Sequence, residues 1–156
     1  MKFALLFALI FLRSFSVQAQ ENTFIAGSWK IITISDADMY LNLETDSSFL
    51  SPEMVKIYPD TPDQKKMMSD ARIIFGSTQF HFEKNGIFRQ TVDTMTIFTG
   101  TYKIDVPNRK LELTSKNSLG EDVTEKMDYD FIDNRLKFSI LLDDTKLHLV
   151  LRKFVK

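Results

Sequence analysis

The sequence predicts an all-β protein, an eight-stranded antiparallel up-and-down β-barrel with a helical insertion between the first and second strands. Residues 79–154 predict the strands, because apolar and polar side chains alternate there with the two-residue period of a half-buried strand. Turn residues such as Asn85-Gly86 separate these segments. An open sheet of this many strands would leave unpaired edges and a bare apolar face. The run must therefore close into a barrel or divide into two packed sheets, and alternation alone is compatible with both.

The first residues have the pattern of a secretory signal peptide. Lys2 precedes an apolar run over residues 3–12, and the polar stretch that follows ends in the small residue Ala19. The run stops at Arg13, well short of the roughly 20 apolar residues that span a membrane. We expect cleavage after Ala19 to remove residues 1–19 and to leave residues 20–156 as one extracytoplasmic domain.

Charge and cysteine content narrow the class of protein further. Removing Lys2 and Arg13 from the 20 basic residues leaves 18 against 21 acidic ones, a net charge of about −3. This balance provides no polybasic surface for nucleic acid or for an anionic membrane. The chain has no cysteine, so an exported form has neither a disulfide nor a thiol for a lipid anchor. These features favour a periplasmic or secreted bacterial protein that does not span the membrane.

The first strand is expected over residues 25–34. Trp29 and Ile31 should project to one face of this strand, and Lys30 and Ile32 to the other. Gly27, two residues before Trp29, indicates a bend or a close backbone approach where the strand begins. Trp29 is the largest apolar side chain available to fill one end of a barrel.

The helical insertion is expected at about residues 51–76. A short strand fits residues 39–43, and turn-forming residues follow it. Ser51 and the proline after it indicate the start of a short helix. A longer amphipathic helix should begin at Thr61, which opens a capping-box sequence, and should end at Gly76.

The remaining seven strands form a meander whose charged residues, such as Lys103 and Asp128, alternate to the outer face. A lipid-facing barrel is disfavoured, because each such charge would cost about 2–4 kcal/mol at the middle of a bilayer. The strands are expected over residues 79–84, 87–93, 96–105, 110–116, 123–132, 135–143 and 146–154. Their inward residues should be Phe80, Phe82, Phe88, Val92, Phe98, Tyr102, Leu111, Leu113, Met127, Tyr129, Phe131, Leu136, Phe138, Ile140, Leu147, Leu149 and Leu151.

With Gly27-Ser28-Trp29 on its first strand and a basic residue, Arg152, on its last, the chain resembles the lipocalin family, and most of all the small lipocalin-like proteins exported by bacteria. The resemblance covers about residues 25–154. It implies a structural role in barrel closure for Gly27, Trp29 and Arg152, with the guanidinium stacked on the indole. The chain departs from typical lipocalins in having no cysteine and in carrying its helix between the first two strands. Fatty-acid-binding proteins place their helical lid in this position.

Residues for catalysis or metal binding are scarce. The two histidines, His81 and His148, both alternate with inward apolar neighbours, so we expect them on the outer surface rather than in a metal site. The sequence shows no phosphate-binding loop and no nucleophile elbow. We therefore expect no catalytic residue, no metal, no cofactor and no enzymatic activity.

Two functions remain open. The first is the binding of a small hydrophobic molecule inside the barrel, and the second is a filled barrel that acts on a protein partner, as an inhibitor or interaction module, through its loops and surface. Because the inward side chains are large, any cavity should lie near the mouth, under the helix. Two tyrosine hydroxyls could orient a ligand there. The expected ligand-binding residues of the interior and the lid are Phe82, Phe88, Phe98, Tyr102, Tyr129, Phe138, Met67 and Met68.

Overall fold

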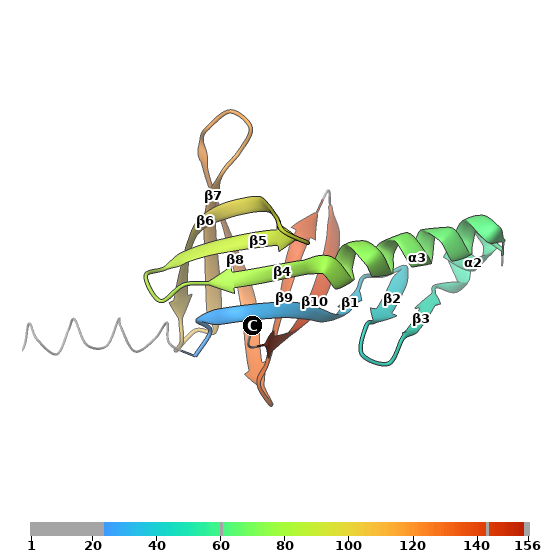
Figure 1. Ribbon diagram of the computed structural model, residues 1–156, viewed down its shortest axis with the longest axis horizontal. Helices are drawn as coiled ribbons and strands as arrows, with labels where there is room; N and C mark the ends of the chain where they lie inside the picture. The colour runs from blue at the N-terminus through green and yellow to red at the C-terminus, as the bar shows by residue number, and fades with distance from the viewer. Residues whose placement is uncertain (1–23, 60, 143, 155–156) are drawn as a thin grey trace, which may run out of the picture.

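The protein folds as a closed antiparallel barrel from which one arm projects (Figure 1). The structure, a computed structural model, describes residues 24–59, 61–142 and 144–154. The signal peptide expected at residues 1–19 lies outside these ranges. No helix in the described ranges is long and apolar enough to cross a membrane.

Eight strands follow one another around the barrel, and pairing of the last with the first closes it. This closure confirms the predicted barrel and excludes two separate packed sheets. The seven strands expected after the insertion are all present, with ends within a few residues of those predicted. The barrel strands are β1 (Gly27–Ser35), β4 (Thr78–Phe82), β5 (Ile87–Val92), β6 (Met95–Asp105), β7 (Lys110–Lys116), β8 (Asp122–Ile132), β9 (Arg135–Leu142) and β10 (Thr145–Phe154).

The closed end of the barrel is packed around Trp29, which is fully buried. Its indole N–H donates to the carbonyl oxygen of Ile25 at 2.7 Å, so the one polar atom of the ring is satisfied. Most of the inward residues predicted from alternation belong to one buried cluster, which includes Trp29. The interior around Trp29 is therefore filled with side chains.

Lys153, rather than Arg152, supplies the cation over Trp29. The Lys153 Nζ lies 5.5 Å from the centre of the ring system. Antiparallel pairing sets Trp29 opposite Lys153 and sets Arg152 opposite Lys30, on the outer face. There Arg152 pairs with the carboxylate of Glu44. The prediction of Arg152 as the stacked residue was wrong by one position. Neighbouring residues of a strand direct their side chains to opposite faces, so an error of one position places the side chain on the wrong face.

Gly27 is required by this closure. Its φ of +134° is one that side-chain-bearing residues rarely adopt, and a Cβ there would lie 2.5 Å from the Lys153 Cε. The atoms close to Gly27 belong to the Lys153 side chain. The backbone passes directly beneath the lysine side chain that covers Trp29.

A β-bulge in β1 changes which residues face the core. The register with β10 shifts between Ile31 and Thr33. Ile31 and Ile34 consequently both join the buried cluster, although strict alternation would have sent them to opposite faces. The predicted alternation holds for Trp29 and Ile31 and fails beyond them.

The arm comprises residues 39–77, between β1 and β4 (Figure 1). It contains a hairpin of β2 (Met39–Asn42) and β3 (Ser47–Leu50), followed by α2 (Pro52–Ile57) and α3 (Pro62–Ser77). Ser51 and Thr61 cap the two helices as predicted, each accepting from a backbone N–H three residues later. β3 was not predicted, because its sequence is rich in turn-forming serine. α3 also continues through Gly76 and runs directly into β4.

We expect Trp29→Ala to lower the free energy of unfolding by about 3–5 kcal/mol, because it leaves a large cavity at the closed end. Ile57→Ala is the matched control, since that side chain is 65% exposed and its truncation should cost no more than about 0.5 kcal/mol. Urea denaturation followed by far-ultraviolet circular dichroism measures both changes. Similar costs for the two substitutions would refute the role given to Trp29.

Candidate functional site

A small cavity, which we call the mouth cavity, opens at the end of the barrel opposite Trp29. Its volume is about 160 Å³. Every strand from β4 to β9 contributes to its wall, so the cavity lies inside the barrel and not on its surface. Its lining residues are Phe80, Phe88, Gln90, Phe98, Leu113, Ser115, Glu125, Phe138, Ile140 and Leu141.

Aromatic rings form the inner surface of the mouth cavity. Phe80 and Phe138 meet edge to face, with ring centres 6.0 Å apart. The rings of Phe88 and Phe98 are tilted against each other, with their centres 5.8 Å apart. Phe98 is 41% exposed, whereas the other three rings are buried. The cavity therefore has a rigid aromatic floor and one ring at its rim, which suits an apolar group that enters from the open end.

The barrel wall is split beside this cavity. β8 and β9 pair only from Tyr129 to Ile132 on β8 and from Arg135 to Phe138 on β9. Beyond these residues β8 continues beside β7, β9 continues beside β10, and the two hairpins diverge (Figure 1). The resulting gap, which we call the lateral opening, has a volume of about 460 Å³.

The lateral opening and the mouth cavity share three lining residues, Glu125, Ile140 and Leu141. The cavity can therefore be reached both from the end of the barrel and through its side. The Glu125 side chain has the inward register of Met127 and Tyr129 but lies close enough to the end of β8 to remain exposed. It is the one ionisable residue in the lining of the cavity.

Backbone groups face the lateral opening. The Tyr129 N–H donates to the carbonyl oxygen of Arg109 at 3.0 Å, on the side of β7. Successive residues of an antiparallel strand direct their backbone groups to opposite edges. Those of Lys126 and Asp128 therefore point toward β9, where no ladder continues in the described part of β8 and β9.

Three of the predicted interior residues, Phe88, Phe98 and Phe138, line the mouth cavity. Phe82, Tyr102 and Tyr129 do not, because they lie deeper and pack in the buried cluster. The Tyr102 hydroxyl donates to the carbonyl oxygen of Glu83 at 2.7 Å. Burial, with a smaller effect from the Glu83 charge, raises the pKa of Tyr102 to about 12. Tyr102 therefore has a structural hydrogen bond at the closed end and does not orient a ligand at the mouth.

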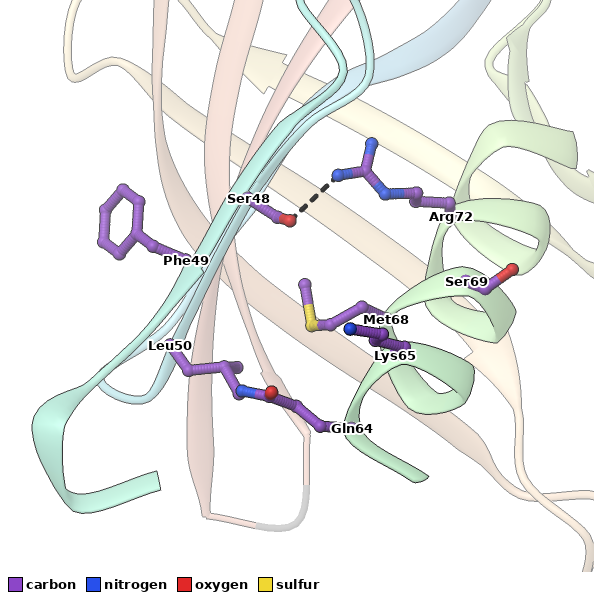
Figure 2. Close-up of a pocket in the computed structure, with 8 residues that line it drawn as sticks. All are labelled: Ser48, Phe49, Leu50, Gln64, Lys65, Met68, Ser69 and Arg72. Carbon is purple, nitrogen blue, oxygen red and sulfur yellow. Dashed lines mark hydrogen bonds between the residues drawn. The ribbon is translucent and has the colours of Figure 1, made fainter. Parts of the chain in front are cut away.

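The helix is not a lid over the barrel. α3 runs outward from the start of β4, and neither Met67 nor Met68 lines the mouth cavity. Met68 instead faces a groove of about 320 Å³ between α3 and the β2–β3 hairpin (Figure 2). Above it Arg72 donates to the Ser48 hydroxyl at 2.8 Å and pairs with the Asp46 carboxylate. α3 thus braces the hairpin, and Met67 and Met68 lie outside the lining of the mouth cavity. Their contacts with a ligand stay a prediction.

Both histidines have hydrogen-bond partners on neighbouring strands. The His81 Nδ1 lies 2.9 Å from the Ser28 hydroxyl, and its Nε2 lies 3.3 Å from the Thr91 hydroxyl. The His148 Nδ1 lies 2.7 Å from the Ser139 hydroxyl. Over the described ranges, no three His, Cys, Asp or Glu residues come close enough to hold a metal ion.

The sequence reasoning did not identify Gln90, Ser115 and Glu125 as site residues. Each has the inward register of its strand but is polar, and all three lie near the mouth. A polar residue at an inward position was the available signal. This signal could not be interpreted from the sequence, because the sequence does not show which end of the barrel is open.

The geometry defines the class of protein as an eight-stranded β-barrel with a filled base and a small apolar cavity at its mouth. No protein-family model matches the chain, and no curated protein matches it in sequence. Among solved structures, it is similar to the crystal structure of a DUF4847 family protein from Bacteroides vulgatus, with a TM-score of 0.53 and 16% sequence identity. The match covers 86% of this chain and 99% of that chain. At this identity the likeness shows the fold alone.

We expect the amides of Lys126 and Asp128 to exchange with deuterium faster than those of Met127 and Tyr129, because their N–H groups face the lateral opening. Hydrogen exchange detected by nuclear magnetic resonance compares the four amides within one strand, so each pair controls the other. Equal protection of Asp128 and Met127 would mean that β8 and β9 stay paired along their whole length in solution.

Proposed function

We propose that this protein is a lipocalin-like, non-enzymatic binder of a small hydrophobic molecule in the periplasm or outside the cell. The observation that carries this proposal is the aromatic mouth cavity together with the split wall that gives access to it. Burial of the ligand's apolar surface would supply the binding energy, at about 25 cal/mol per Å².

The size of the cavity limits the ligand. A volume of about 160 Å³ is close to the roughly 150 Å³ of an engineered protein cavity that holds benzene. The apolar group that enters should therefore be a single ring or a short branched chain. Any larger remainder of the ligand would lie in the lateral opening, which is wider and carries polar groups on its outer margin.

We expect Ile140→Trp to weaken the binding of a neutral aromatic probe, benzyl alcohol, at least tenfold, because the larger ring occupies the cavity. Titration calorimetry gives the affinity, and thermal denaturation checks that the variant is folded. Ile132→Trp is the matched control: Ile132 is 50% exposed on the outer face of β8, opposite Arg135 and outside the cavity lining, so the same substitution there leaves the cavity unchanged. Equal affinities in the two variants would place binding elsewhere.

The arm favours a second candidate function, recognition of a protein partner. Phe49, Ile57 and Ile73 are 64–66% exposed, and all three lie on the projecting segment. The ring of Phe49 also stacks on that of Tyr40, with ring centres 4.8 Å apart. This contact holds the Phe49 ring on the outer face of the hairpin, away from α3 (Figure 2). Fixed and exposed apolar side chains are typical of interaction surfaces.

For this second candidate we expect a photo-crosslinking residue at Phe49 to give one discrete protein adduct in cells, and one at Leu119 to give none. Leu119 is 79% exposed on the loop between β7 and β8 and is a control for exposure alone. The adduct should disappear when Ile57 and Ile73 are both replaced by serine while the barrel stays folded. The same adducts from both positions, or none from either, would contradict the candidate.

A further inference from the structure

We infer that the mouth cavity selects a cationic ligand, an amine with a small aromatic or branched apolar group, and that Glu125 is the residue that selects it. This inference rests on the proposed function, because it names the ligand class for the same cavity. The juxtaposition that supports it is a carboxylate at the rim of a cavity that is otherwise neutral and aromatic.

The register of β8 brings Glu125 to this position. Met127 and Tyr129, two and four residues further on, are buried in the core. Glu125 continues the same face and lies opposite Leu113, which also lines the cavity. A glutamate at an inward position costs desolvation unless it is near the surface or has a partner. Glu125 meets the first condition, because it is exposed at the end of the barrel.

Nearby charged groups have partners on the outer face or lie outside the lining of the mouth cavity. Lys126 forms an ion pair with Glu112 at 2.7 Å, and Asp128 forms one with Lys110 at 2.6 Å. Lys146 lines the lateral opening together with Glu125, but it is not part of the lining of the mouth cavity. Among the described residues, no ion pair is formed by Glu125.

A ligand ring in the cavity would place a substituent of one or two bonds at the rim, where Glu125 and the exposed face of Phe98 lie. An ammonium group there would gain a carboxylate partner and a cation–π contact. A carboxylate on the ligand would instead meet a like charge, and no basic residue lines the cavity to offset it. The lining therefore disfavours fatty acids and other small carboxylic acids.

The test compares three probes that share one ring: benzylammonium, benzyl alcohol and phenylacetate. Because Glu125 is exposed, we expect benzylammonium to bind about two- to fivefold more tightly than benzyl alcohol, the range of an exposed charge pair. Phenylacetate should bind most weakly of the three. The preference for the cation should shrink in about 0.5 M salt.

Two substitutions at Glu125 and one control complete the design. E125Q should make the affinities for benzylammonium and benzyl alcohol equal without changing that for the alcohol, and E125K should make phenylacetate the preferred charged probe. D130N removes an equal charge from the outer face of the same strand, outside the lining of both the mouth cavity and the lateral opening, and should keep the original order. If the alcohol binds and benzylammonium binds no better, this inference fails and the proposed function stands. If no probe binds, both fail.

Discussion

The structure depends on how the two edges of β1 are shared among its neighbours. One edge pairs with β10 from Ser28 to Ser35 and closes the barrel. The other edge pairs with β4 up to Lys30 and with β2 from Thr33 onward. Two strands cannot occupy one stretch of an edge, so the chain that links β2 to β4 must leave the barrel. The arm, and an open mouth without a lid, follow from this division of the β1 edge.

The β-bulge in β1 fits the same division. It lies between Ile31 and Thr33, where the outer neighbour changes from β4 to β2. Ile31 and Ile34 then both reach the core, while Ile32 is buried beside Leu43 of the arm. A bulge increases local strand twist, which turns the second half of β1 and the hairpin away from the barrel. Pairing of Glu44 with Arg152 fastens the base of the arm to β10.

Features set by short-range rules could be predicted from the sequence. Alternation located the barrel strands, and the residues Ser51 and Thr61 located both helix starts, because capping and pleating act over a few residues. The bulge, the direction of α3 and the divergence of β8 from β9 could not be predicted. Each depends on which partner an edge finds in three dimensions. Glu125 was overlooked as a site residue for the same reason. Its place at the open end of the barrel depends on how all the strands pack together, which the sequence of β8 alone does not indicate.

In the proposed function, selection of the ligand by size and selection by charge come from different parts of the barrel. The base is closed by Trp29 beneath Lys153, and the middle is filled by side chains such as Tyr102, whose hydroxyl is already bonded to the backbone. A long acyl chain could bury only its last few carbons in the mouth cavity and would forgo about 0.8 kcal/mol for each methylene left in water. For the proposed function, this shallow depth therefore disfavours long-chain lipids whatever their headgroup. Among ligands short enough to fit, the charge at the rim would then set the preference, and Glu125 is the charged group of the cavity lining. If the proposed function holds, a filled base and an acidic rim together favour small amines over fatty acids.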